Sequence, residues 1–303
     1  MNAVRLSGVT KNYGAHRAVD SLDLSIPTGS VYGFIGPNGS GKTTTIRMIL
    51  HIIHPDQGEI EVLGRKETRA SNDRIGYLPE ERGMYKKMSV KRLLTYYGTL
   101  KGMSKRDARR VGVEWMEKLG LEAWIDKKVE ALSKGMAQKV QFISTVISAP
   151  ELVILDEPFS GLDPVNLEVL RAAILELRES GSTVIFSTHD MTMAEQMCDS
   201  IFMIYRGKKV LDGTVASVRA SYRADTIRLK LSGGRSVLEG LQGIDSVNDM
   251  GHIQEVRFSG DSQELLQRLM AVTAVNHFEI TEPSLHNIFI RIASPEPEDV
   301  AHV

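Results

Sequence analysis

The stretch "VYGFIGPNGSGKTTTIRMILHII", residues Val31–Ile53, decides how this chain folds. It opens with a short apolar run, passes through a glycine-rich turn, and continues with Ile46, Ile49 and Ile53 at helical spacing. This pattern predicts a strand, a loop and a helix in direct succession. The turn matches G-x-x-x-x-G-K-[ST] at Gly36–Thr43 and lies where that pattern requires, between a strand and a helix.

The glycine-rich turn has the composition of a phosphate-binding loop. Its glycines let backbone N–H groups close around phosphates, and the helix N-terminus adds positive potential. Lys42 is expected to reach the β- and γ-phosphates, and Thr43 to hold Mg²⁺. The predicted nucleotide-binding residues of the loop are Gly36, Pro37, Asn38, Gly39, Ser40, Gly41, Lys42, Thr43 and Thr44.

Two further strands end in residues suited to phosphate chemistry. The run "LVIL" leads into Asp156 and Glu157, and "TVIFST" leads into His189. A lone histidine at a strand end is more often structural, but ligands in open α/β sheets gather at the carboxyl ends of strands. We therefore expect Asp156 to hold Mg²⁺ or its water, Glu157 to polarise an attacking water, and His189 to donate to the γ-phosphate.

Two similar stretches compete as a second anion site: "LSKGMAQK" at 132–139 and "LSGGRS" at 231–236. The first begins a helix with Ser133 as the N-cap, and that helix leads into the strand that carries Asp156. The second follows a strand near the C-terminus and has no acidic strand after it. We therefore predict an anion site at the first stretch, and turn residues at Gly233 and Gly234 in the second.

The periodicity along the chain predicts an α/β fold with two domains. Short apolar strands alternating with amphipathic helices indicate a mostly parallel sheet covered by helices on both faces. The first domain is expected over 1–218, with antiparallel strands at its N-terminus and an inserted helical subdomain at about 86–132. The β-α-β-β-α-β order after it predicts a small ferredoxin-like α+β domain over 222–303.

Composition narrows the class of protein further. The formal net charge is only −1, which gives no general attraction to nucleic acid or anionic lipid. The basic cluster Lys101, Lys105, Arg106, Arg109 and Arg110 is most simply a solvated helix face, with an acidic partner surface as the alternative. No apolar run approaches the ~20 residues of a membrane span. Neither an export signal nor a second cysteine beside Cys198 is found, so a cytoplasmic chain is expected.

Taken together, these motifs resemble the ATP-binding subunit of an ABC transporter, from Val4 to about Gly213. Five motifs stand in that family's order: the Walker A loop "GPNGSGKT", the signature "LSKGM", the Walker B strand "LVILDE", the D-loop "SGLD" and the switch histidine in "STHD". The resemblance implies a P-loop ATPase core that uses ATP and Mg²⁺, with Tyr13 stacked on adenine. It also implies that the ATP site is completed by a second copy through Ser133, Lys134, Gly135, Met136 and Asp163.

Two positions depart from the family's usual sequence. Glu80, in "YLPEERGMY", stands where a glutamine that contacts Mg²⁺ is usual, and it is retained here as a metal candidate beside Thr43 and Asp156. The signature reads LSKGM where LSGGQ is commonest, so Lys134 adds a cation and Met136 lacks the polar contacts of glutamine.

The C-terminal stretch "EPSLHNIFIRI" resembles an extension found in a subgroup whose partners are ABC-2-type exporters. The resemblance thus implies a dimer of this chain or of a close relative, attached to the cytoplasmic face of the membrane by a permease, with no nucleic-acid partner. A soluble ATPase of this type acting on DNA or ribosomes is the alternative function. A regulatory binding role for the tail, with the ATPase as its switch, is also open.

Overall fold

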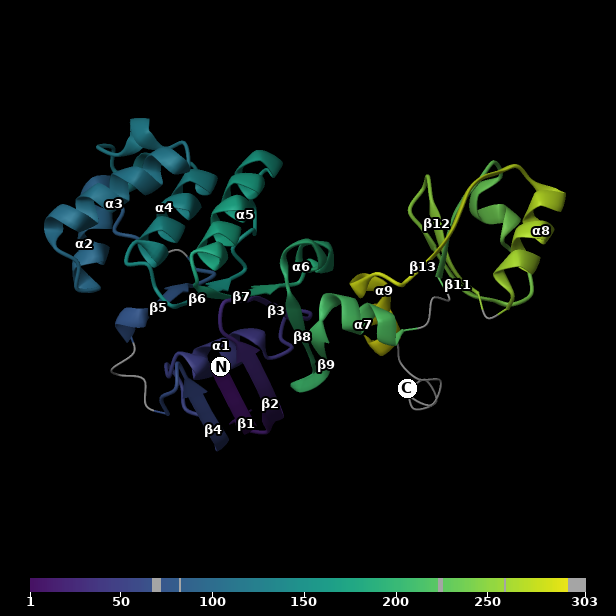
Figure 1. Ribbon diagram of the computed structural model, residues 1–303, viewed down its shortest axis with the longest axis horizontal. Coiled ribbons are helices and arrows are strands. Elements are labelled where there is room, and N and C mark those ends of the chain that lie inside the picture. Colours follow the sequence, from purple (N-terminus) through teal and green to yellow (C-terminus); the bar gives the residue numbers. More distant parts are fainter. Residues whose placement is uncertain (67–71, 82, 223–225, 259, 294–303) are drawn as a thin grey trace. The chain divides into compact units, whose positions relative to one another are not determined.

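The first unit of the structure is organised around a six-stranded sheet with the order β5-β6-β7-β3-β8-β9 (Figure 1). The strands are β3 (Val31–Ile35), β5 (Ile75–Leu78), β6 (Leu152–Asp156), β7 (Thr183–Thr188), β8 (Ser200–Tyr205) and β9 (Lys208–Thr214). Neighbouring strands are parallel from β5 to β8, and β9 pairs antiparallel with β8. Strands β3, β6 and β7 are buried at every position, and the centre of each is apolar, as expected for parallel strands covered on both faces. The predicted parallel sheet is confirmed.

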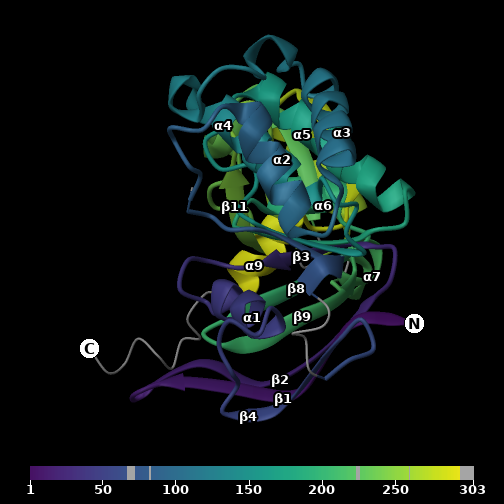
Figure 2. The same ribbon diagram turned by 90° about the vertical axis from the view of Figure 1, so that its left-hand side faces the viewer.

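One face of this sheet packs on α1 and on a second, antiparallel sheet. Helix α1 is Lys42–Ile49, and the second sheet contains β1 (Asn2–Tyr13), β2 (His16–Pro27) and β4 (Gln57–Val62) in the order β2-β1-β4. Ile46 and Ile49 of α1 share one apolar core with Leu24 of β2 and Phe34 of β3. Both views place α1 between the two sheets (Figure 2).

Helices cover the other face of the six-stranded sheet. The helices are α2 (Val90–Leu100), α3 (Lys105–Lys118), α4 (Lys134–Val146), α5 (Pro164–Glu179) and α6 (Met191–Met197), and the 3₁₀ turns of this unit are η1 (Asn72–Arg74), η2 (Glu122–Trp124) and η3 (Val129–Ala131). A second core cluster joins Phe142 of α4 and Ile174 of α5 to Leu155 and Phe186 of the sheet. Helices α2 and α3 form a tight hairpin, because a Cβ at Gly98 would lie only 2.6 Å from the Cβ of Ala108.

The second unit contains a four-stranded antiparallel sheet with the order β11-β12-β10-β13. Its elements are α7 (Val215–Ser221), β10 (Thr226–Leu231), the 3₁₀ turn η4 (Gly234–Val237), β11 (Ile244–Asp249), β12 (Gln254–Phe258), α8 (Ser262–Val272), β13 (Val275–Thr281) and α9 (Leu285–Ala293). This sheet order is the one expected for a ferredoxin-like fold. The expected β-α-β-β-α-β order includes a helix between β10 and β11, but the described residues there contain only the turn η4, and Gly240 and Gly243 after it adopt positive φ (88° and 91°).

The structure, a computed structural model, describes residues 1–66, 72–81, 83–222, 226–258 and 260–293. It divides into the units Met1–Thr214 and Val215–Val303, so the division precedes α7, whereas a boundary at 218–222 was expected. Arg219 of α7 donates to the carbonyl of Glu282, which explains why α7 groups with the second unit. No helix in the described ranges combines the length and apolar character needed to span a membrane.

Candidate functional site

The glycine-rich loop forms a tight cradle between β3 and α1. Gly36 and Gly41 have φ of 149° and 115°, and a Cβ on either would lie 2.3 Å and 2.5 Å from the carbonyl oxygens of Ile204 and Ala18. Lys42 donates to the carbonyls of Gly36 (2.7 Å) and Pro37 (3.1 Å). Burial lowers the pKa of the Lys42 ammonium, and the charges of Glu157, Asp156 and Glu80 oppose that shift. The loop therefore holds a buried cation at the start of a helix.

The two acids after β6 are held by a serine on the neighbouring strand. Ser187 of β7 donates to Asp156 Oδ1 (2.5 Å) and accepts from the backbone N–H of Glu157 (3.0 Å). The parallel register places Asp156 and Ser187 directly beside each other. Asp156 is buried, with 2% of its surface exposed. The carboxylate that the sequence assigned to Mg²⁺ is thus fixed at the sheet edge.

Glu157 and His189 contact each other across the carboxyl ends of β6 and β7. Glu157 Oε1 lies 3.0 Å from His189 Nδ1, with 11% of the glutamate side chain and 61% of the histidine side chain exposed. Glu157 also has φ of 49°, a left-handed conformation that costs a non-glycine residue on the order of 1 kcal/mol or more. A carboxylate and an imidazole are thus paired at the carboxyl ends of these two strands.

A cleft of about 370 Å³ lies between the glycine-rich loop and the two acids at the end of β6. Its wall includes the loop, both acids after β6, Glu80 and Tyr13. Tyr13 ends β1 with 48% of its surface exposed, and its ring lies 5.9 Å from the Lys11 ammonium nitrogen. An exposed aromatic ring at the mouth of a phosphate cradle suits a stacked base.

The cleft has the chemistry for a triphosphate with Mg²⁺. Ser40 Oγ is buried without a hydrogen-bond partner in the described ranges, so the cradle contains an unsatisfied polar atom. Oxygen ligands preferred by Mg²⁺ are present in the Thr43 hydroxyl and the carboxylates of Asp156 and Glu80. Among the described residues, no group of three His, Cys, Asp or Glu side chains converges as a preformed metal site. Phosphate oxygens and water would therefore complete the coordination.

The signature stretch begins α4 as predicted but lies outside the wall of this cleft. Ser133 is the N-cap and accepts from Met136 N (3.3 Å), while Gly135 faces Leu162 and Asn166. Asp163 likewise caps α5, accepting from the N–H of Asn166 at 3.0 Å. The chain therefore brings the cradle, both acids, Tyr13, Glu80 and His189 together, and presents the signature on another element.

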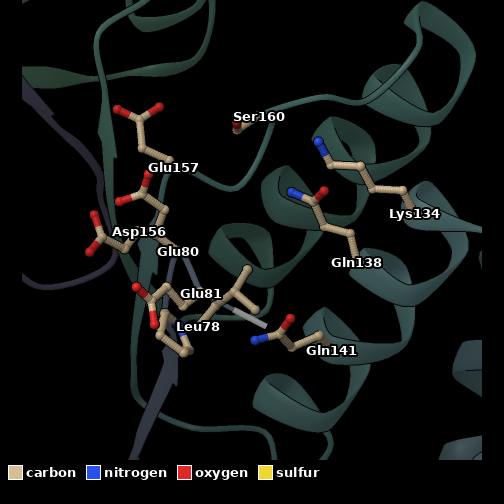
Figure 3. Close-up of a pocket in the computed structure, with 10 residues that line it drawn as sticks. Leu78, Glu80, Glu81, Lys134, Gln138, Gln141, Asp156, Glu157 and Ser160 are labelled. Atoms are coloured by element: carbon tan, nitrogen blue, oxygen red, sulfur yellow. The ribbon is translucent and has the colours of Figure 1, made fainter. Parts of the chain in front are cut away.

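Lys134 is a signature residue that shares a pocket with several acids. It lines a second pocket, of about 380 Å³, opposite Glu80, Glu81 and Glu157. Figure 3 shows Lys134, Gln138 and Gln141 extending from α4 toward those carboxylates. A Cβ on Gly161 of the D-loop would lie 2.6 Å from Lys134 Nζ, so this ammonium rests on the D-loop of its own chain.

Three polar residues of the site were missed by the sequence reasoning. Ser187 lies within "IFSTHD", but the pairing of β6 with β7 that makes it important is not a local property. Gln138, which donates to the carbonyl of Pro158, and Gln141 follow the signature on α4. Their four- and seven-residue spacing from Lys134 would have placed all three on one helix face.

The second copy, "LSGGRS", belongs to the second unit. Leu231 ends β10, and Gly233 and Gly234 lie at the start of the turn η4, with φ of 60° at Gly234. The prediction that these glycines are turn residues is confirmed. The lone cysteine, Cys198, packs on the core beneath the helices, and burial raises the pKa of its thiol.

Comparisons with known proteins agree with this geometry. The family described as "ABC transporter" matches residues 19–160, and "ATP-binding protein DrrA1-3-like, C-terminal domain" matches residues 213–293. The uncharacterized ABC transporter ATP-binding protein YhaQ of Bacillus subtilis (strain 168) is 42% identical over 284 residues, which cover 93% of this chain and 95% of that protein. The daunorubicin/doxorubicin resistance ATP-binding protein DrrA of Streptomyces peucetius is 33% identical, covering 78% and 73%.

A solved structure supports the same assignment. The structure of an ATP-binding subunit of an ABC transporter superposes with a TM-score of 0.68 at 27% identity, covering 72% of this chain and 92% of that one. The chain therefore belongs to the ABC transporter family as one of its ATP-binding proteins, and it is an ATPase. These relatives support the function of a transporter ATPase subunit and give no support to the alternative, a soluble ATPase acting on DNA or ribosomes.

Proposed function

We propose that this chain powers export through a separate integral-membrane permease, as a dimer of itself or with a close relative that closes around ATP. The main support for this proposal is that the signature LSKGM lies outside the nucleotide cleft of its own chain. The cleft is lined by Tyr13, the glycine-rich loop, Glu80, Asp156 and Glu157, whereas Ser133, Gly135 and Met136 begin a different element of the same chain. The signature of a second copy would therefore supply the remaining anion contacts.

Each residue has a stated role in this proposal. Lys42 and His189 bind the γ-phosphate from one copy, and Ser133, Lys134, Gly135, Met136 and Asp163 close the site from the other. Mg²⁺, when bound to Thr43, Asp156 and Glu80, would neutralise charge on the phosphates. Glu157 accepts the proton of the attacking water, and its contact with His189 holds the carboxylate at the sheet edge. Loss of the γ-phosphate removes the bridge between the copies, so the dimer opens.

The export direction and the membrane partner are inferred from the second unit and from relatives. That unit matches the DrrA1-3-like C-terminal domain, and both DrrA and the linearmycin resistance protein LnrL of Bacillus subtilis are named as resistance proteins. A pocket of about 460 Å³ lies beside the Glu80 loop, and its lining includes Ile52, Met84 and Tyr97. These apolar side chains would form a binding site for a segment of the permease. The chain would thereby lie at the cytoplasmic face of the membrane.

The test uses the Glu157→Gln protein. This variant should bind ATP normally, lower turnover at least about a hundredfold through loss of a general base, and accumulate an ATP-bound dimer in light-scattering chromatography. Trapped with Mg·ATP and purified from gently solubilised membranes, it should retain a multi-span membrane protein in stoichiometric amount. Recovery without any membrane protein would refute the permease assignment, and wild-type turnover would remove Glu157 from its role.

A further inference from the structure

The charge of this chain is concentrated in one place. Residues 84–110, here called the basic segment, contain nine Lys or Arg and one acid, Asp107. The whole chain contains 37 Lys and Arg against 38 Asp and Glu, so the other 276 residues hold 28 basic against 37 acidic residues. The basic segment thus has a formal net charge of +8, whereas the other 276 residues together have a net charge of −9. The near-neutral total conceals this asymmetry.

Most of these cations are exposed and unpaired. Three of the nine are engaged: Lys91 pairs with Asp126, Arg110 pairs with Glu114, and Lys101 donates to the Ile75 carbonyl. The remaining six are exposed, and within the described ranges none forms an ion pair: Lys86, Lys87, Arg92, Lys105, Arg106 and Arg109. The single acid is engaged locally, since the Asp107 carboxylate accepts from the Ser104 hydroxyl at the start of α3.

The basic segment also exposes apolar side chains among its cations. Leu100 is 59% exposed at the end of α2, and Tyr85 is 51% exposed. Tyr85 and Tyr96 stack edge to face with their centroids 5.8 Å apart. The segment covers α2, the start of α3 and the residues before α2, which lie at the outer edge of the helical subdomain (Figure 1). Tyrosine and aliphatic groups between Lys and Arg are the mixture that suits a lipid–water interface.

We propose that the basic segment binds the anionic headgroups of the membrane in which the permease resides. This inference rests on the proposed function, which brings the chain to that membrane. Charge complementarity favours the lipid surface, because six exposed cations on the α2–α3 hairpin and the residues before it match a diffuse negative layer and need no specific register. A contact made through exposed cations would be peripheral and reversible by salt. It would orient the helical subdomain toward the bilayer.

The test is sedimentation of the purified full chain with vesicles. Binding is expected to vesicles of about one-third phosphatidylglycerol in phosphatidylcholine, and not to pure phosphatidylcholine. Raising NaCl from about 0.1 M to about 0.5 M should release the protein. A variant with Lys86→Gln, Lys87→Gln, Arg106→Gln and Arg109→Gln should bind at least about a hundredfold more weakly, since each surface cation contributes roughly fivefold.

A charge-matched variant controls for net charge. Arg5→Gln, Lys208→Gln, Lys230→Gln and Arg235→Gln remove four exposed cations elsewhere and should leave vesicle binding within about threefold. Both variants should hydrolyse ATP like the wild type, because none of the eight residues lines the nucleotide cleft. Equal loss of binding in the two variants, or salt-independent binding to both vesicle types, would overturn the inference.

Two outcomes separate this inference from the proposed function. Vesicle binding that depends on the four cations, in a chain that co-purifies with no membrane protein, supports the lipid contact while the permease assignment fails. Conversely, a chain that ignores anionic vesicles but needs the four cations to retain its permease refutes the lipid contact and assigns the segment to an acidic protein surface.

Discussion

Removal of the Ser187 hydroxyl tests whether the catalytic edge is organised as described. The Ser187 side chain is fully buried, and its Oγ joins the Asp156 carboxylate to the Glu157 N–H. Ser187→Ala loses a hydrogen bond to a charged group, worth about 1.5–3 kcal/mol, and leaves the Glu157 N–H without this acceptor, so the free energy of unfolding should fall by about 2–4 kcal/mol. Urea denaturation followed by circular dichroism measures this change.

The same substitution should slow hydrolysis. Without the Ser187 hydroxyl, the Glu157 N–H loses its acceptor, so the left-handed backbone of Glu157 is free to relax and to move the carboxylate. A displacement of about 1 Å at a reacting group can lower the rate on the order of a hundredfold. We expect kcat for ATP to fall at least about thirtyfold at saturating Mg²⁺, with a small change in the Kd for ATP.

Ser182→Ala is the matched control. Ser182 is also buried before β7, and its Oγ donates to the Pro150 carbonyl (2.8 Å), far along the strand from the acids. Its loss should cost about 1 kcal/mol of stability and leave kcat within about twofold. If the two variants have the same kcat at equal folded fraction, Ser187 does not position Glu157 and the reasoning is wrong.

Three further substitutions probe the cleft. Tyr13→Ala should weaken ATP binding by roughly tenfold or more, as for loss of a base–aromatic stack. Tyr13→Trp should bind ATP almost as the wild type does, and Tyr13→Ala should bind tripolyphosphate, which has no base, almost as the wild type does. Fluorescence titration measures these affinities. Glu80→Gln should raise the half-saturating Mg²⁺ concentration for hydrolysis by about threefold or more, because one carboxylate ligand is lost; an unchanged Mg²⁺ dependence would remove Glu80 from the metal site. Gly36→Ala should lower the free energy of unfolding by more than about 2 kcal/mol, since its Cβ meets the Ile204 carbonyl. Gly39→Ala, with open space around the added Cβ, should lower it by about 1 kcal/mol. Equal losses of the two variants in denaturant titrations would contradict the tight cradle.

The chemistry of the site was predictable from the sequence because each motif is local. The glycine-rich loop, the acids after β6 and the histidine after β7 each follow an apolar strand within a few residues. Their convergence also follows from sequence, since parallel strands place their carboxyl ends at one edge. The roles of individual residues remain predictions.

Properties that depend on pairing or on backbone conformation were not predictable. Ser187 becomes a partner of Asp156 only through the adjacency of β6 and β7, which lie some thirty residues apart in sequence. The helix expected after β10 has suitable apolar spacing, yet two glycines with positive φ end it as a single turn. The charge asymmetry of residues 84–110, by contrast, can be counted from the sequence, and the interpretation of the cations near 101–110 as a solvated face stays a prediction.

The alternation of side chains along β6 limits where the sequence can accept an insertion or a deletion. Leu152 and Ile154 face the core that contains α1, and Val153 and Leu155 face the core beneath the helices. By the same alternation, Asp156 falls on the α1 side, and the positive φ of Glu157 returns the next carboxylate to the same edge. Insertion or deletion of one residue in "LVIL" would turn both acids to the opposite face of the sheet. Viable length variants should therefore be found in the surface loops of this chain and be absent from β6.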